Sequence, residues 1–155
     1  MRVLIACGGT GGHINPGLAI ADIIKSKYPD TEFLFAGTPK GMEAKLVPAA
    51  GYRFETIKVA GFQRRISLEN IGRNAKAVAY LITSGRRAKQ IIEGFKPDIA
   101  IGTGGYAAGP VIRKAARMGI PTAIHEQNAY PGVTNKLLSK EVDHVMLTVK
   151  EALNF

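Results

Sequence analysis

The sequence predicts an α/β domain in which a parallel sheet is covered by helices on both faces. Short continuous apolar runs, of which Val3–Cys7 is the first, are typical of strands that are buried on both sides. Such runs alternate with helix-like segments along the whole chain, and this alternation indicates right-handed crossovers. The 155 residues, of which 46% are hydrophobic, are enough for one domain with a full core.

The individual elements follow from local patterns. We expect strands at Val3–Cys7, Glu32–Ala36, Phe54–Val59, Asp98–Gly102, Thr122–His125 and His144–Val149. We expect helices that begin at Pro16, Met42, Ser67, Pro110 and near Pro131. Proline favours a first helical turn because it has no N–H to leave without a partner. The helix after Ser67 is long, and a bend or break is expected near Ser84 and Gly85.

Composition narrows the class of protein. The only cysteine, Cys7, cannot form an internal disulfide, which fits a reducing compartment. The longest apolar stretch, Ala77–Ile82, is far shorter than the roughly 20 residues that span a bilayer. The segment Met1–Cys7 is too short for a signal peptide. We therefore expect a soluble domain of the cytosolic type.

Positive charge is concentrated in the middle of the chain. The net charge is +9, and residues Arg53–Lys96 hold ten basic and three acidic side chains. Apolar residues recur there at three- and four-residue spacing from Ile71 onward, which predicts a basic amphipathic helix. Such a helix can lie on an anionic membrane, or it can turn its apolar stripe to the core and its basic face to solvent. Nucleic-acid binding rests on charge alone, because no stacking platform or recognition motif accompanies it.

Three loops are predicted at the carboxyl edge of the sheet, where open α/β sheets bind ligands. They are Gly8–His13 (the first loop), Gly102–Tyr106 (the second loop) and His125–Ala129 (the third loop). Each leads into a helix N-terminus, where free N–H groups and the helix dipole favour an anion. Glycines let a phosphate approach the backbone closely. The loops therefore predict a ligand that carries phosphate.

Common phosphate and catalytic motifs do not fit these loops. A G-x-G-x-x-G pattern counted from Gly9 reaches Ile14 where the last glycine should stand, and the second strand ends at Ala36 without an acidic residue for a ribose. No Lys-Ser or Lys-Thr pair follows the glycines as in a P-loop. No Cys and His cluster and no G-x-S-x-G elbow is present. NAD binding, ATP hydrolysis, metal chemistry and a serine nucleophile are all disfavoured.

The polar residues of the loops also have structural interpretations. His13 can bond locally at a helix start, and Tyr106 can pack against its neighbours. Glu126 and Asn128 can cap the helix that follows them. Cys7 is expected to fill core space below the first loop. The convergence of three loops, rather than any single residue, favours a ligand site.

Longer motifs in these loops resemble the MurG family of bacterial glycosyltransferases. They read GGTGGHINPGLA from Gly8, GGYAAGP from Gly104 and HEQNAYPGVTNK from His125, and the resemblance extends from Met1 to about Thr148. It implies the Rossmann-like amino-terminal half of a GT-B enzyme, which moves N-acetylglucosamine from UDP-N-acetylglucosamine to lipid I, an undecaprenyl-pyrophosphoryl-muramyl-pentapeptide. The resemblance also implies that the donor-binding carboxy-terminal domain is absent from this chain, and we expect the isolated domain to be inactive.

The resemblance also implies roles for single residues in an inverting displacement, which needs a base and stabilisation of the departing diphosphate. His13 is the first candidate for the base, since imidazole titrates near neutral pH, and Glu126 is the second. Residues expected to bind the acceptor and its pyrophosphate are Gly9, Thr10, Gly11, Gly12, Gly104, Gly105, Tyr106, Gln127 and Asn128. No Asp-x-Asp pair is present, so neither a metal nor another cofactor is expected.

The family resemblance shifts the interpretation of the basic segment toward membrane contact. The residues expected to touch lipid are Arg64, Arg65, Ile71, Arg73, Lys76 and Leu81. The expected partners are lipid I, UDP-N-acetylglucosamine (mainly through the carboxy-terminal domain) and an anionic membrane surface, with no nucleic acid. The implied location is cytoplasmic, peripheral on the cytoplasmic face of the inner membrane. The alternative is a non-catalytic acceptor- and membrane-binding subunit of a split lipid-linked glycosyltransferase.

Overall fold

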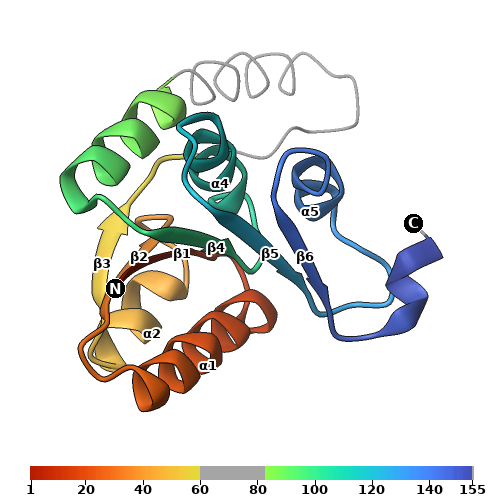
Figure 1. The fold of residues 1–155 in the computed structure, drawn as a ribbon, viewed down its shortest axis with the longest axis horizontal. Coiled ribbons are helices and arrows are strands. Elements are labelled where there is room, and N and C mark those ends of the chain that lie inside the picture. Colours follow the sequence, from red (N-terminus) through yellow and green to blue (C-terminus); the bar gives the residue numbers. More distant parts are fainter. Residues whose placement is uncertain (60–82, 155) are drawn as a thin grey trace.

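A computed structural model describes residues 1–59 and 83–154. Its sheet has six strands, all paired in parallel, in the order β3-β2-β1-β4-β5-β6. The strands are β1 (Arg2–Ala6), β2 (Glu32–Gly37), β3 (Arg53–Thr56), β4 (Ile99–Gly102), β5 (Thr122–Glu126) and β6 (His144–Leu147). The predicted parallel α/β fold is therefore confirmed (Figure 1).

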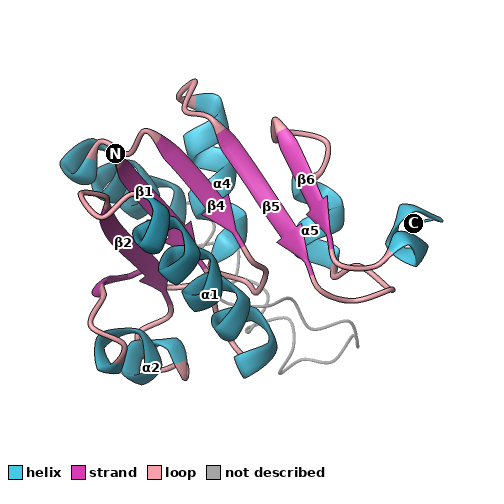
Figure 2. Ribbon diagram, turned by 60° about the horizontal axis from the view of Figure 1, so that its bottom comes forward, coloured by secondary structure: helices cyan, strands magenta, loops and turns pink. Residues whose placement is uncertain are grey.

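Helices connect successive strands and cover both faces of the sheet. They are α1 (Gly11–Lys27), α2 (Glu43–Ala49), a helix whose described part covers residues 83–95, α4 (Ala108–Arg117), α5 (Val133–Leu138) and the short 3₁₀ helix η1 (Lys150–Asn154). Figure 2 shows α1 and α2 on one side of the sheet and α4 and α5 on the other. Across residues 1–59 and 83–154, no helix has the length and apolar character needed to cross a bilayer.

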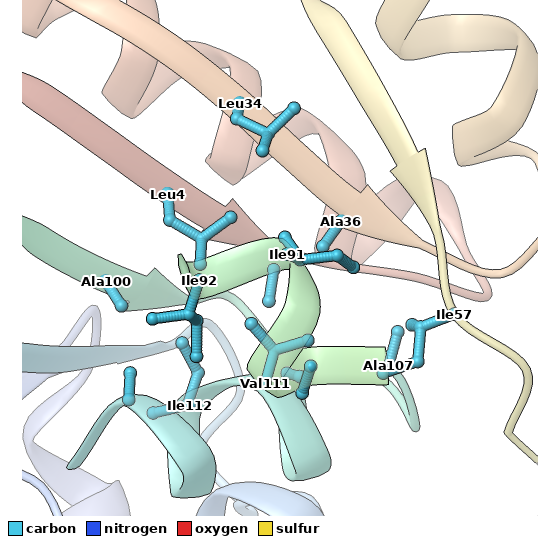
Figure 3. Packing of buried hydrophobic residues seen from close by; sticks show 14 of the residues in the cluster. Leu4, Leu34, Ala36, Ile57, Ile91, Ile92, Ala100, Ala107, Val111 and Ile112 are labelled. Carbon is cyan, nitrogen blue, oxygen red and sulfur yellow. The ribbon is translucent and has the colours of Figure 1, made fainter. Parts of the chain in front are cut away.

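Alternating residues of the central strands supply two separate cores. On β1, Leu4 and Ala6 face one cluster, which contains buried residues of the helix at 83–95, of α4 and of α5, while Val3 and Ile5 face the other, which contains residues of α1 and α2. Because successive side chains of a strand point to opposite faces, a central strand covered on both sides must be apolar throughout. Figure 3 shows the first cluster, with Leu4 among the labelled residues of the strands and Val111 among those of the covering helices.

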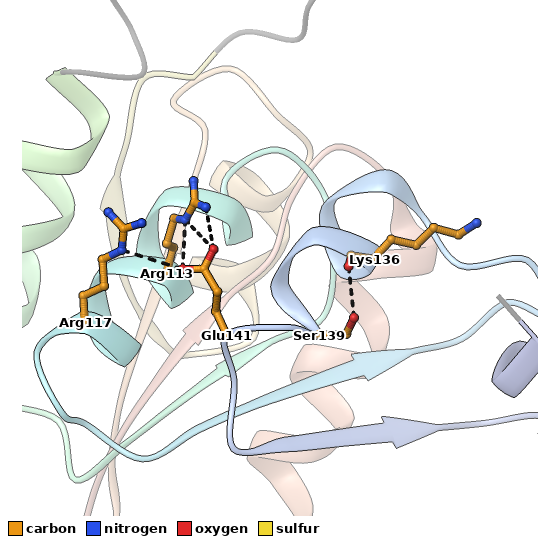
Figure 4. Close-up of polar contacts among 5 residues, drawn as sticks. All are labelled: Arg113, Arg117, Lys136, Ser139 and Glu141. Carbon is orange, nitrogen blue, oxygen red and sulfur yellow. Dashed lines mark hydrogen bonds and ion pairs between the residues drawn. The ribbon is translucent and has the colours of Figure 1, made fainter.

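Polar contacts hold α4, the end of α5 and the turn before β6 together, on the side of the sheet that carries the first cluster. Arg113 on α4 donates to both carboxylate oxygens of Glu141 in the turn before β6, through Nε at 2.7 and 3.0 Å and Nη2 at 2.5 Å. Arg117 lies 3.6 Å from the same carboxylate, and the Ser139 hydroxyl donates to the Lys136 carbonyl at 3.0 Å at the end of α5 (Figure 4). The two-pronged Arg113 contact fixes the approach of β6 better than a single-point ion pair would.

The predicted start of the first helix is wrong. Helix α1 begins at Gly11, five residues before Pro16, so the proline lies inside the helix. Glycine has low helix propensity, but the first turn is held from outside, because the Thr103 hydroxyl donates to the His13 carbonyl at 2.7 Å. Ser84 and Gly85 are both helical, and the bend or break near them stays a prediction, because the residues before 83 lie outside the described part of the chain. The predicted start at Ser67 lies outside the described residues.

Candidate functional site

The ends of three neighbouring strands form one edge of the sheet. Ala6 at the end of β1 pairs with Gly102 at the end of β4, and Gly102 pairs with Ile124 on β5. The three loops that follow these strands are also linked directly, because the Gln127 side-chain amide donates to the Thr103 carbonyl at 3.0 Å and the Thr103 hydroxyl donates to the His13 carbonyl. The predicted convergence of the three loops at one edge is confirmed.

The glycines of the second loop allow it to pack against the first. Gly104 and Gly105 have φ values of +106° and +83°, which L side chains rarely adopt. A Cβ at Gly105 would lie 2.1 Å from the Gly8 carbonyl oxygen, and one at Gly104 would lie 2.6 Å from Cδ2 of His13. Both positions therefore need glycine so that the backbone can approach the first loop and its histidine. Phosphate approach alone, the basis of the prediction, does not account for them.

His13 is half-buried in the first turn of α1 between these two loops. Its Nδ1 lies 3.0 Å from the Gly8 carbonyl oxygen and 3.5 Å from the Thr10 hydroxyl. Because a carbonyl oxygen can only accept, the contact with Gly8 is a hydrogen bond when Nδ1 carries the proton. That tautomer leaves Nε2 with a free lone pair, which is the state that a general base requires.

The backbone donors of the first loop divide into two groups. The Gly9 amide donates to Oε2 of Glu43 at 3.1 Å, so the expectation that this amide is free for a ligand is wrong. Gly11 and Gly12 lie in the first turn of α1, where amides have no partner within their own helix, and no acceptor for them exists in the described part of the chain. The start of α1 therefore carries amide donors without a partner, and a helix N-terminus of this kind favours an anion.

Glu43 is a site residue that sequence reasoning missed. It is the first residue of α2, its side chain is fully buried, and its Oε1 accepts the amide and the hydroxyl of Thr38 at 2.8 and 2.7 Å. Burial acts to raise the pKa of Glu43, but the bonds from Thr38 and Gly9 outweigh it and lower the pKa. Glu43 is thus a buried carboxylate directly below the first loop.

In the third loop, Glu126 organises the backbone. Only 3% of its surface is exposed, and its two carboxylate oxygens accept four bonds of 2.9 to 3.1 Å from Asn128 (amide and side chain), Gly132 and Asn135. Burial acts to raise the pKa of Glu126, but these four donors lower it overall. A carboxylate that accepts this many bonds is a weak proton acceptor, and its contact with Gly132, the residue before α5, agrees with the capping interpretation.

The remaining loop residues differ in their access to solvent. His125 has both ring nitrogens engaged, because Nδ1 accepts from the Gln127 side chain at 3.0 Å and Nε2 lies 3.2 Å from the Thr148 hydroxyl. Burial lowers the pKa of His125, partly offset by the charge of Glu126. Tyr106 is 64% exposed, so it does not pack into the core. Tyr106 is the last residue of the second loop, and its side chain is open to solvent.

The other predictions divide between core and undescribed residues. Cys7 is fully buried, and burial with a smaller contribution from the charge of Glu43 raises its pKa to about 12. This confirms that Cys7 fills core space. The six residues expected to contact lipid lie outside the described residues: Arg64, Arg65, Ile71, Arg73, Lys76 and Leu81.

The fold and this edge define a class of protein, a Rossmann-like domain with glycine-rich loops at the carboxyl ends of its strands. A family model described as the glycosyltransferase family 28 N-terminal domain matches residues 3–147. The chain therefore belongs to glycosyltransferase family 28, as an N-terminal domain of that family.

Relatives and solved structures agree with this assignment. The chain is 55% identical over 152 residues to the UDP-N-acetylglucosamine--N-acetylmuramyl-(pentapeptide) pyrophosphoryl-undecaprenol N-acetylglucosamine transferase of Acetivibrio thermocellus, covering 98% of this chain and 40% of the relative. It is 54% identical to the protein of the same name from Ruminiclostridium cellulolyticum, covering 98% and 41%. The crystal structure of Acinetobacter baumannii MurG matches with a TM-score of 0.79 at 30% identity, over 94% of this chain and 40% of that one.

More distant structures agree in fold only. The glycosyltransferase SsfS6 of Streptomyces sp. SF2575 matches with a TM-score of 0.61 at 19% identity, over 91% of this chain and 45% of that one. The chain spans about 40% of the length of the curated relatives it matches. The resemblance to MurG and the expected Rossmann-like fold are confirmed.

Proposed function

We propose that this chain is the acceptor-binding, membrane-associating half of an inverting transferase. The enzyme would move N-acetylglucosamine from UDP-N-acetylglucosamine to lipid I and so form lipid II. The names of the relatives support this reaction, and the geometry of His13 at the convergent edge is the observation that carries it. The donor sugar nucleotide would be held mainly by a separate carboxy-terminal domain, and the isolated domain would not turn over.

The proposed step needs one base at the acceptor. The acceptor hydroxyl would lose its proton to Nε2 of His13 while its oxygen bonds to the anomeric carbon of the donor. The bond from that carbon to the diphosphate would break, and UDP would leave. The tautomer favoured by the Gly8 contact supports His13 in this role, whereas the four bonds to Glu126 support a positioning role for that residue.

The pyrophosphate of the acceptor would lie against the start of α1. The amides of Gly11 and Gly12 and the positive end of a 17-residue helix supply an anion site without a metal. The exposed side chains of Tyr106 in the second loop and of Asn128 in the third loop would contact the rest of the acceptor. Thr10, Gly104, Gly105 and Gln127 would hold these groups in place.

The base is tested in the full-length protein that contains this domain. We expect His13→Ala to lower turnover about 10²- to 10⁴-fold, the usual contribution of a general base. His144→Ala is the matched control, because His144 is exposed at the start of β6, on the opposite edge of the sheet. A His13→Ala enzyme that folds and retains near-normal turnover would remove His13 from the mechanism.

Membrane association is a separate part of the proposal. We propose that the basic segment contacts the anionic inner membrane on its cytoplasmic face, because Arg53–Lys96 carries an excess of seven positive charges. Co-sedimentation of the chain with anionic vesicles should weaken as salt is raised. It should also weaken when Arg64, Arg65, Arg73 and Lys76 are replaced by Glu. Binding that is unchanged by this replacement would contradict the membrane contact.

A further inference from the structure

Buried Glu43 lies in a space that glycines leave open for it. A Cβ at Gly8 would lie 2.7 Å from Oε1 of Glu43, one at Gly37 would lie 2.5 Å from its Cγ, and one at Gly41 would lie 2.2 Å from its Oε2. These glycines belong to two different strand ends and the turn before α2. The backbone around Glu43 therefore has room for this carboxylate only while the three positions carry no side chain.

The carboxylate contacts the first loop through one peptide group. The N–H of Gly9 donates to Oε2 of Glu43 at 3.1 Å. The carbonyl of Gly8, which is the other end of the same peptide group, lies 3.0 Å from Nδ1 of His13. The amide nitrogen and the carbonyl oxygen of a peptide group are conjugated, so a charge that polarises the N–H also makes the oxygen a stronger acceptor.

Within residues 1–59 and 83–154, no ion pair neutralises the negative charge of Glu43. Among the described residues, no Lys or Arg forms a salt bridge with it, and its partners are the neutral donors Gly9 and Thr38. The second loop closes the far side of the same peptide group, because Gly105 packs on Gly8. The peptide group is therefore fixed in orientation and polarised by Glu43.

We propose that Glu43 is a positioning residue, which acts on His13 through the peptide group between Gly8 and Gly9 and holds its imidazole with the proton on Nδ1. A carboxylate that bonds directly to a catalytic histidine fixes the same tautomer in other enzymes. Here a peptide group stands between the two side chains. That a free Nε2 serves to accept the acceptor proton rests on the proposed function. The link from Glu43 to His13 through the peptide group does not.

The test measures the tautomer of His13 in the isotopically labelled 155-residue chain. Imidazole ¹H–¹⁵N correlation spectra, recorded about two pH units above the usual histidine pKa, should show the Nδ1–H form of His13 as the major one. We expect Glu43→Gln to lower the ratio of the Nδ1–H form to the Nε2–H form about threefold, the size of a modest loss of hydrogen-bond polarisation.

Two control variants separate positioning from mere support. Thr38→Val removes a hydroxyl bond to Glu43 but keeps the charge and the Gly9 bond, so stability should fall while the tautomer ratio stays. Glu32→Gln removes an exposed carboxylate at the start of β2 and should change neither. An unchanged His13 ratio in Glu43→Gln, or a wild type that is mainly in the Nε2–H form, would overturn the proposal.

A measurement on the unmodified chain covers the case in which Glu43→Gln does not fold. Scalar couplings across hydrogen bonds should join Gly9 ¹⁵N to Glu43 ¹³Cδ and His13 ¹⁵Nδ1 to Gly8 ¹³C′, and their absence in assigned spectra would contradict the link. The result of these NMR measurements does not depend on whether the protein transfers a sugar. If His13→Ala keeps its turnover while Glu43→Gln shifts the tautomer, the proposed base fails and the link from Glu43 stands.

Discussion

Gly105→Ala tests the packing between the first and second loops, on which the geometry of the edge depends. The residue has a φ of +83°, and its new Cβ would lie 2.1 Å from the oxygen, 2.8 Å from the carbon and 3.1 Å from the nitrogen of Gly8. All three are backbone atoms, so no side chain can rotate to relieve the overlap. We therefore expect the backbone itself to move.

Gly51→Ala is a matched control for this change. Gly51 has the same φ of +83°, but nothing lies within 4 Å of its added Cβ. The left-handed backbone costs an L residue about 1–2 kcal/mol, and this cost is common to both variants. The overlap in Gly105→Ala adds about 1–3 kcal/mol, the usual cost of overpacking. The difference between the two variants therefore isolates the contact between the loops.

Urea unfolding of the 155-residue chain measures this difference. With an m-value of about 2 kcal/mol/M, we expect the midpoint of Gly105→Ala to lie about 0.5–1.5 M below that of Gly51→Ala. Amide shifts of the first loop should change only in Gly105→Ala. If the two midpoints coincide and the first loop keeps its shifts, the second loop does not pack on Gly8 as described.

Three further predictions concern buried ionisable groups. Glu126→Gln should destabilise the chain at pH 7 by about 2–4 kcal/mol. Because the folded-state pKa of Glu126 is lowered, the difference in urea midpoint between wild type and variant should narrow as pH falls through that folded pKa; a difference independent of pH would contradict this. Cys7, whose pKa is raised to about 12, should resist thiol reagents at pH 8 until urea unfolds the chain, as mass spectrometry can follow; rapid labelling of the folded chain would show it accessible. Burial, with the bond to Asp22, raises the pKa of Tyr52 to about 12, so Tyr52→Phe should remove a late phase from the phenolate absorbance titration and cost about 1 kcal/mol of stability; a titration without that phase in the wild type would refute the assignment.

The strands could be predicted from the sequence because their signal is local. Runs such as Val3–Cys7 are apolar at every position, since helices cover the sheet on both faces. The start of α1 could not be predicted in the same way. Glycines and an internal Pro16 argue against a helix locally, and the bond from Thr103 that supports its first turn comes from a residue 90 positions away.

The candidate site was predicted as three loops, but not as a set of contacts. Motif spacing placed His13 and the third loop at the right edge, because parallel strands all end on the same side. Glu43 could not be predicted as a buried residue, because an isolated acidic residue is usually exposed. Its partner Gly9 is also 34 positions away in the sequence. The glycines at 8, 37 and 41 surround this carboxylate, and only the fold brings them together.

The two buried carboxylates together explain how loops without a single Lys or Arg keep a defined shape. Glu43 anchors the first loop through Gly9, and Glu126 anchors the third through Asn128 and Gly132. Each carboxylate takes up amides that would otherwise face the edge, so its charge is satisfied inside the protein. The amides of Gly11 and Gly12 at the start of α1 are not taken up in this way, because the first turn of α1 has no acidic side chain. The two carboxylates thus hold the first and third loops from inside the protein and leave the amides of Gly11 and Gly12 as donors.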